Sequence, residues 1–214
     1  MNHRKTLRLF RNLNEAIPEP VTELLHRNHF ELLIAVILSA QATDKSVNKV
    51  TENLFEHYPN PAAVLEAGEA GILTEIKTIG LANTKAKNIV KTCRMLIEHH
   101  RGEVPKTREA LESLAGVGRK TANVILNTAF GHPVIAVDTH VFRVSNRTGL
   151  TSGKTPEQVE KQLMEVVPKK WKKDAHHFLV LHGRYVCKAQ RPNCPECPIL
   201  KECEFSEKIS NKKN

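Results

Sequence analysis

The sequence of 214 residues contains no apolar run long enough to cross a membrane. Its longest apolar stretch, residues 30–40, is interrupted by Glu31 and Ser39, whereas a membrane helix needs roughly 20 apolar residues. Residues 1–14 lack the apolar core of a secretory signal. We therefore expect no membrane partner and a cytoplasmic protein, whose reducing surroundings disfavour structural disulfides. Residues 30–40 are better interpreted as a buried core helix.

Strict alternation of apolar and polar residues, the pattern of a half-buried strand, is also missing. Apolar residues recur instead at helical spacing along almost the whole chain. The scattered glycines and prolines exclude collagen-like and low-complexity classes and divide the chain into about ten short helices, with one break at residues 68–71. The short apolar run at residues 134–137 is interpreted as a buried approach to a helix. The predicted fold class is all-α.

Acidic residues are too few to balance the basic ones. Lys and Arg number 32 against 23 Asp and Glu, which gives a net charge of +9. Residues 169–214 hold 11 basic and 5 acidic residues, so much of the excess lies near the C-terminus. This balance favours a polyanionic partner, although a merely solvated basic surface fits the charge equally well.

A glycine hairpin is the first specific motif. A short helix over residues 108–114 stops at Gly116-Val117-Gly118, and a second helix starts at once. Free backbone N–H groups at such a helix start bind phosphate without reading bases. In the second helix we expect Lys120 on an exposed polar face together with Asn123 and Asn127. A tight helical hairpin without any ligand is the alternative interpretation.

Four of the five cysteines lie within a short C-terminal segment with the spacing C-x6-C-x2-C-x5-C. Four thiols so close together in a reducing compartment indicate a metal site. The spacing alone fits zinc and an iron–sulfur cluster about equally. The predicted ligands are Cys187, Cys194, Cys197 and Cys203, and Cys93 is expected to be a buried apolar side chain.

Three features in this order resemble the endonuclease III family of helix-hairpin-helix DNA glycosylases. They are the segment LAGVGRKTANV at residues 114–124, the segment VDTHVFRV at residues 137–144, and the cysteine cluster at residues 187–203. The resemblance implies a base-excision repair enzyme that removes oxidised pyrimidines from duplex DNA and cleaves the abasic strand. It also implies that the four cysteines hold a [4Fe-4S] cluster.

Lys120 and Asp138 are the catalytic residues that the resemblance implies. An uncharged lysine amine can attack C1′ of the sugar, displace the base and leave a Schiff base that eases β-elimination. The chain has only three aspartates, and Asp138 can stabilise positive charge developing on the sugar. Asp138 also fits the N-cap of a helix over residues 139–147, and both roles can hold together.

The resemblance further assigns DNA contacts. Gln41 and Leu81 are expected to insert into the duplex when a nucleotide is flipped out. Ser39 and Asp44 are assigned to the base pocket. The remaining contacts are expected from the hairpin residues Gly116, Val117 and Gly118 and from two cations that the cluster loop carries, Lys188 and Arg191.

The resemblance implies two helical lobes. One comprises residues 22–132 and contains the hairpin at residues 108–127, and the other comprises residues 1–21 with residues 133–214. We expect a monomer acting on double-stranded DNA with oxidised pyrimidines or abasic sites, nucleoid-associated if bacterial. Two alternatives are a monofunctional glycosylase of the same fold and a DNA-binding iron–sulfur protein without catalysis.

Overall fold

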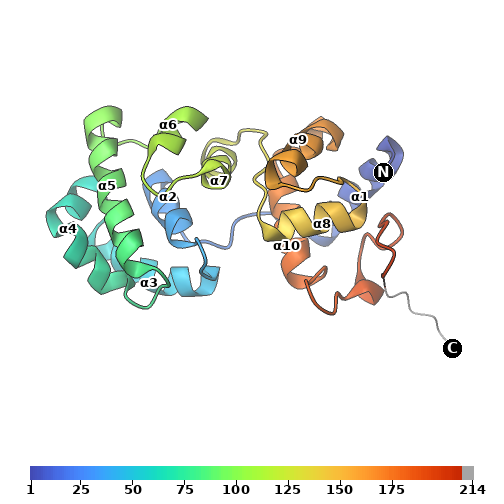
Figure 1. The fold of residues 1–214 in the computed structure, drawn as a ribbon, viewed down its shortest axis with the longest axis horizontal. Coiled ribbons are helices and arrows are strands. Elements are labelled where there is room, and N and C mark those ends of the chain that lie inside the picture. Colours follow the sequence, from blue (N-terminus) through green and yellow to red (C-terminus); the bar gives the residue numbers. More distant parts are fainter. Residues whose placement is uncertain (209–214) are drawn as a thin grey trace. The chain divides into compact units, whose positions relative to one another are not determined.

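The computed structural model describes residues 1–208, and in this part of the chain it contains ten α-helices, two short 3₁₀ turns and no strand (Figure 1). The all-α prediction is confirmed. The lobe prediction and the basic C-terminal stretch both extend to residue 214, so their last six residues, 209–214, lie outside the described residues. No helix within residues 1–208 is long and apolar enough to span a membrane.

The chain forms two compact units. The central unit runs from Thr22 to Gly131, and the terminal unit joins Met1–Val21 to the chain from His132 onward. The helices of the central unit are α2 (His29–Leu38), α3 (Asp44–His57), α4 (Pro61–Ile76), α5 (Ala82–His100), α6 (Arg108–Ser113) and α7 (Arg119–Phe130).

Helix α2 is the core of the central unit. Every residue from Phe30 to Leu38 is buried, and α2 contacts α3, α5 and α7. The single acidic residue of this helix, Glu31, is 1% exposed and pairs with Arg27 at 2.8 Å. The buried core helix expected at residues 30–40 is therefore confirmed as far as Leu38, whereas Ser39 is only partly buried and Ala40 is exposed.

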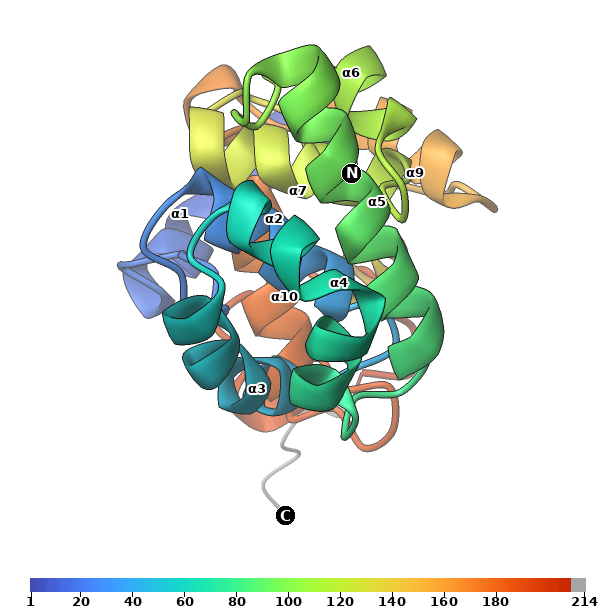
Figure 2. The same cartoon turned by 90° about the vertical axis from the view of Figure 1, so that its left-hand side faces the viewer.

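Helices α4 and α5 lie side by side in the same unit (Figure 2). The break expected at residues 68–71 is present at Gly68. Two helical segments, which together make up α4, meet there across a kink, and the φ of 64° at Gly68 is one that only glycine adopts without strain. Cys93 on α5 is fully buried, as expected.

The terminal unit contains α1 (His3–Ala16), α8 (Thr139–Thr148), α9 (Pro156–Val166) and α10 (Ala175–Tyr185), with 3₁₀ turns at Lys169–Trp171 and Cys194–Glu196. Phe10 on α1 and Phe178 on α10 are fully buried in its core. Residues 134–137 form neither helix nor strand, and Ile135 and Ala136 are fully buried, which confirms the expected buried approach to α8.

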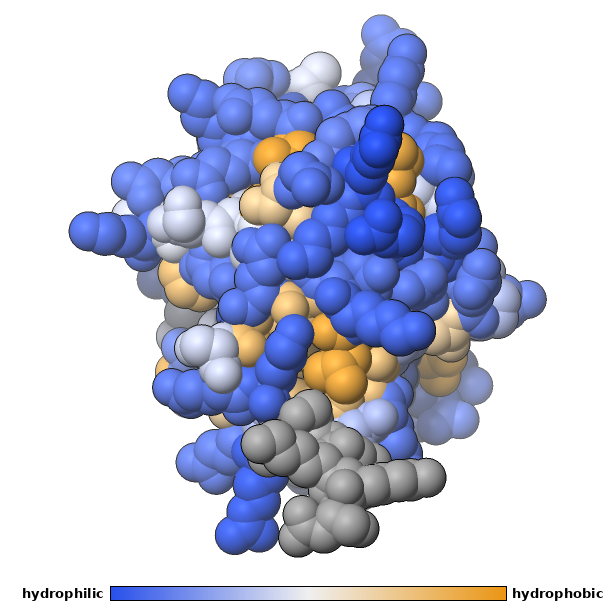
Figure 3. Space-filling view, turned by 90° about the vertical axis from the view of Figure 1, so that its right-hand side faces the viewer, coloured by the Kyte–Doolittle hydropathy of each residue, from blue (hydrophilic) through white to orange (hydrophobic). Residues whose placement is uncertain are grey.

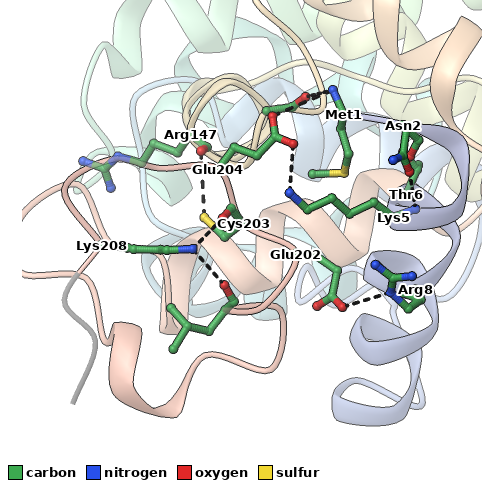
Figure 4. A network of polar contacts seen from close by, with 12 residues as sticks. Met1, Asn2, Lys5, Thr6, Arg8, Arg147, Glu202, Cys203, Glu204 and Lys208 are labelled. Carbon is green, nitrogen blue, oxygen red and sulfur yellow. Dashed lines mark hydrogen bonds and ion pairs between the residues drawn. The ribbon is translucent and has the colours of Figure 1, made fainter. Parts of the chain in front are cut away.

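Polar contacts join the two ends of the terminal unit (Figure 4). The N-terminal amine donates a hydrogen bond to the carbonyl of Gly149 at 3.1 Å, and Lys5 donates to Glu204 at 2.9 Å. Glu202 is 5% exposed and pairs with Arg8 at 3.5 Å. The outer surface in Figure 3 is mostly hydrophilic, with hydrophobic residues confined to small patches.

We predict that stability falls as the pH drops, because α10 buries His177. Burial, together with the charge of His176, lowers the pKa of His177 from 6.5 to about 3. The unfolded chain therefore binds an extra proton between these two pH values, and the stability present above pH 6.5 is lost progressively as the pH falls toward 3. The loss approaches about 1.4 kcal/mol per pH unit for this group.

The measurement is urea unfolding at pH 7, 6 and 5, followed by circular dichroism. His177→Asn removes the titrating group, and we expect a shallower pH dependence of its unfolding free energy. His3→Asn, on the exposed surface of α1, is the control and should keep the original slope. Parallel slopes for His177→Asn and the unaltered protein would contradict the prediction.

Candidate active site and nucleic-acid interface

The glycine hairpin is formed as the sequence predicts. Helix α6 is capped by Thr107, whose hydroxyl accepts a hydrogen bond from the N–H of Ala110 at 3.3 Å. The chain then turns through residues 114–118, and α7 starts directly after Gly118. Because Gly118 has no side chain, nothing caps the start of α7 through a side-chain hydrogen bond. The positive end of the helix dipole is therefore left for an outside anion.

The two glycines of the turn are needed for different reasons. Gly116 has a φ of +76°, and a Cβ there would lie 2.9 Å from the side-chain nitrogen of Asn88. Gly118 is in extended backbone, and a Cβ there would have no neighbour within 4 Å among residues 1–208. Gly116 therefore serves the fold of the hairpin, whereas Gly118 leaves the surface open.

One hairpin amide is already occupied. The N–H of Val117 donates to the carbonyl of Leu114 at 3.2 Å, and the side chain of Val117 is only 6% exposed. The expectation that the backbone N–H groups of this turn all stay exposed is wrong for Val117. Its role is to anchor the turn from the inside, because an apolar side chain gains more by burial than by facing water.

Lys120 lies exposed in the first turn of α7. Asn123 and Asn127, expected on the same polar face, are instead buried, at 0% and 3% exposure. The amide of Asn123 has no hydrogen-bond partner within the described residues. Helix α7 packs against both α2 and α6, so more of its surface is covered than the apolar stripe alone accounts for. Lys120 and Arg119 are the two exposed cations in the first turn of α7.

Asp138 caps helix α8, as the sequence predicts. Its Oδ1 accepts a hydrogen bond from the N–H of Val141 at 2.8 Å, and the side chain is half-buried. The preceding residues 135–137 are buried, which fixes the direction in which the chain enters the cap. The cap holds the carboxylate in a defined orientation.

Two arginines of α8 hold the start of the cysteine loop. Arg143 donates to the carbonyls of Cys187 at 3.0 Å and Gly183 at 2.8 Å. Arg147 donates to the carbonyls of Lys188 at 2.7 Å and Ala189 at 2.9 Å. The sequence analysis missed both residues, although their spacing of four places them on one face of a helix.

The four predicted ligands line one cavity of the terminal unit. Arg147 donates to the sulfur of Cys187 at 3.8 Å, and Nε2 of His182 lies 3.7 Å from the sulfur of Cys197. Cys203 donates from its sulfur to the carbonyl of Arg147 at 3.8 Å (Figure 4). Within residues 1–208, no three His, Cys, Asp or Glu side chains are grouped as ligands of a single metal ion.

The thiols of this cavity oppose one another's ionisation. Burial raises the pKa of Cys197 to about 11, and the charges of Cys203, Cys187 and Cys194 add to the rise. Burial and neighbouring thiols raise the pKa of Cys203 as well. Several thiolates can coexist here only if cations lie among them, which is the condition that bound metal fulfils. The donor set therefore fits a metal centre.

The remaining predicted contacts lie on loops. Lys188 and Arg191 are exposed between the first two cysteines of the cluster, and Arg191 has a φ of 49°. Ser39 donates its hydroxyl to the carbonyl of Val36 at 2.8 Å, so its proton is engaged with the end of α2. Asp44 is the first residue of α3 and is half-buried.

Gln41 and Leu81 are both exposed loop residues of the central unit, and Leu81 is 56% exposed. Leu81 therefore does not pack onto its own helix. Both residues have left-handed backbone, with φ of 54° and 61°, which is strained for any residue other than glycine. Such strain is often kept at functional positions.

Comparison with known proteins shows which family this chain resembles. Residues 34–169 match the family model of HhH-GPD superfamily base excision DNA repair proteins. Endonuclease III of Haemophilus influenzae is 60% identical over 209 residues, covering 98% of this chain and 99% of that protein. The chain belongs to the endonuclease III family of the HhH-GPD superfamily.

Solved endonuclease III structures agree with this assignment. A trapped endonuclease III–DNA covalent intermediate has a TM-score of 0.90 and 47% identity, covering 95% of this chain and 96% of that chain. A non-covalent endonuclease III–DNA complex has a TM-score of 0.90 and 48% identity at the same coverage. The HhH-GPD match ends at residue 169, whereas the full-length endonuclease III match also spans the cysteine loop.

We predict that the two hairpin glycines of this endonuclease III family member respond differently to alanine. Gly116→Ala should lower the unfolding free energy by about 1–2 kcal/mol, because the left-handed φ is strained and Asn88 must move. Gly118→Ala should change it by less than about 0.5 kcal/mol, since the added methyl meets nothing. Urea unfolding of the two variants measures this, and equal losses would contradict the assigned roles.

Proposed function

We propose that this protein is a bifunctional DNA glycosylase and abasic-site lyase, which removes oxidised pyrimidines from duplex DNA and nicks the resulting abasic strand. The observation that carries the proposal is the exposed Lys120 in the uncapped first turn of α7, in a chain that is 60% identical to endonuclease III. A lysine in this position combines an amine nucleophile with a phosphate-binding helix end.

Lys120 is the nucleophile in this mechanism. Its uncharged amine forms a bond to C1′ of the deoxyribose as the bond from C1′ to the base breaks, and the base leaves with its electron pair. Loss of protons from the nitrogen and opening of the sugar ring give a Schiff base. This acidifies the 2′ hydrogen, and its removal expels the 3′ phosphate by β-elimination.

Asp138 assists at the sugar. The oxygen that caps α8 keeps the carboxylate in one orientation, and its negative charge stabilises the positive charge that develops as the base departs. The same carboxylate moves protons to and from the intermediates. Capping and catalysis thus use one side chain: capping needs only its oxygen acceptor, which the N–H of Val141 holds in place, whereas catalysis also needs its negative charge.

DNA is bound by backbone and loop groups. The amides around Gly116 and Gly118 approach a phosphate, with Val117 holding the turn from below. Gln41 and Leu81 enter the space that a flipped nucleotide leaves. Ser39 and Asp44 are assigned to the base pocket; the hydroxyl of Ser39 is already bonded to the backbone, which leaves its oxygen as an acceptor.

The four cysteines of the terminal unit hold a [4Fe-4S] cluster in this proposal. Their spacing and their common cavity fit a cationic cluster core, as does the pKa of Cys197, which burial and the neighbouring cysteines raise to about 11. One Cys pair alone is short, unlike most structural zinc sites. When bound, the cluster supplies rigidity to the loop. Lys188 and Arg191 then meet phosphates from a fixed backbone, which Arg147 also supports.

The two functional lobes are proposed at residues 22–132 and at residues 1–21 with residues 133–214. The grouping of contacts into two units, with a boundary within one residue, supports this division. We expect the protein to act as a monomer, and in the cytoplasm, with the nucleoid where its DNA substrate is chromosomal.

Two other functions predict different chemistry. A monofunctional glycosylase uses activated water and forms no covalent bond to DNA, so it has no need for an amine at the start of α7. A DNA-binding protein without catalysis needs neither Lys120 nor Asp138, because phosphate contact requires only cations and amides. The presence of both residues favours the bifunctional enzyme.

We predict that sodium borohydride traps the protein on duplex DNA carrying an oxidised pyrimidine. Lys120→Ala should abolish trapping and lower single-turnover excision at least about 1,000-fold, because no other group supplies the amine. Asp138→Asn should lower excision about 100-fold and leave the fold intact, since asparagine also caps helices.

Lys91→Ala, at an exposed lysine of α5, is the matched control and should trap normally. An adduct that survives Lys120→Ala would remove the assigned nucleophile. Absence of trapping by the unaltered protein, with excision retained, would favour the monofunctional enzyme, and absence of both would favour a binding protein.

We also predict about four iron and four sulfide ions per purified chain, with broad visible absorbance. Cys203→Ser should lower the iron content and this absorbance, because one ligand is lost. Cys93→Ala, which changes a buried cysteine of the other unit, should leave the iron content unchanged. Stoichiometric zinc with no sulfide would contradict the cluster assignment.

A further inference from the structure

The two loops that carry Gln41 and Leu81 lie near each other within the central unit. A Cβ added to Gly80, the residue before Leu81, would lie 3.8 Å from the carbonyl oxygen of Gln41, an ordinary van der Waals distance. Gln41 and Leu81, the tips of the two loops, both have left-handed backbone and exposed side chains. The position of one exposed tip relative to the other depends on how the two loops are held.

One buried side chain connects the elements behind these tips. Lys85 lies on α5, one turn after Leu81, and is only 4% exposed. Its Nζ donates a hydrogen bond to the carbonyl of Leu38 at 2.9 Å. Leu38 is the last residue of α2, three residues before Gln41. Lys85 therefore bridges the end of the helix before the first tip and the start of the helix after the second.

The backbone makes this bridge stiff. The N–H of Lys85 donates to the carbonyl of Leu81 at 3.0 Å, so Leu81 is tied to the same residue whose side chain reaches α2. Leu38 is fully buried, as is nearly all of α2. A change in the length of this connection would displace one tip relative to the other.

Joining two helices through a buried ammonium group costs free energy of desolvation. Desolvation lowers the pKa of Lys85, which measures the cost of keeping its charge out of water. Helix α2 has no basic residue in its last turn, so the ammonium faces the negative end of the helix dipole and regains part of that cost. An apolar side chain of the same length would fill this space without the cost but could not hold the Leu38 carbonyl.

We propose that Lys85 is a positioning residue for base extrusion, which fixes the spacing of Gln41 and Leu81 so that both tips fill the gap in the duplex together. This inference rests on the proposed function and extends it to a residue that does not touch DNA. At 4% exposure, Lys85 cannot act as a phosphate contact. Its ammonium group instead donates a hydrogen bond to the protein's own backbone.

The test uses Lys85→Met, which keeps the length of the side chain and removes the ammonium, and Lys85→Arg, which retains a cation. Single-turnover excision of an oxidised pyrimidine from duplex DNA is compared with cleavage of an abasic site in single-stranded DNA, where no gap needs filling. We expect Lys85→Met to slow the duplex reaction about tenfold or more, with cleavage of the single strand within about twofold. Lys85→Arg should restore part of the duplex rate.

Lys87→Met, two residues along the same helix and exposed, is the matched control for the loss of one positive charge. It should leave both reactions near the original rate at matched salt. A double-mutant cycle separates positioning from general stability: if Lys85 acts through the tips, Lys85→Met should add little to the defect of a Gln41→Ala, Leu81→Ala variant.

The outcomes distinguish the two levels of the proposal. If the unaltered protein excises no base, the proposed function fails and the inference falls with it. If the unaltered protein is active and Lys85→Met matches it on duplex DNA, only the inference falls. Equal losses on both substrates, or a defect fully additive with that of the tips, would also overturn it. If circular dichroism shows that Lys85→Met does not fold, Lys85→Arg is compared with the unaltered protein instead. Full activity of Lys85→Arg on duplex DNA, or equal losses on both substrates, would then overturn the proposal.

Discussion

Helix α7 is preceded by a residue that has no side chain, and this constraint shapes the start of the helix. Most helices within residues 1–208 are preceded by an Asn, Thr or Asp whose oxygen accepts an N–H of the first turn; α7 is preceded by Gly118 and has no such cap. The positive end of the helix dipole therefore has no side-chain cap, and Lys120 is the second residue of the helix. A helix start of this kind suits an anion, and the exposed Lys120 lies in the same turn.

Helix α8 shows the opposite arrangement. Asp138 satisfies its first turn, and Arg143 and Arg147 on the same helix satisfy carbonyls of the cysteine loop. Helix α8 is thus capped at its start by the carboxylate of Asp138, and its side holds the predicted cluster loop through Arg143 and Arg147. Arginine suits this support because its planar group holds two carbonyls at once, whereas a lysine offers a single point charge.

Local patterns predicted a large part of this structure. The glycine turn, the Asp138 cap, the buried run before α8 and the buried Cys93 each depend on residues close in sequence, so their chemistry can be interpreted without a fold. Two of the failed predictions depend on packing between helices: Asn123 and Asn127 are buried on a helix that packs against both α2 and α6. The prediction for Val117 failed for a local reason, because its N–H closes the turn itself. Arg143, Arg147 and Lys85 were missed because their partners lie distant in sequence.

The sequence by itself determined the helical class, the hairpin and the set of cysteines, because helix periodicity, glycine backbone freedom and thiol chemistry are properties of short segments. The discontinuous lobes came from resemblance, since periodicity carries no information about which helices pack together. Only the tertiary structure decided that Gly80, next to Leu81, lies near the carbonyl of Gln41 and that a buried lysine bonds to the end of α2. This hydrogen bond joins residues 38 and 85, which packing alone brings close enough to form it.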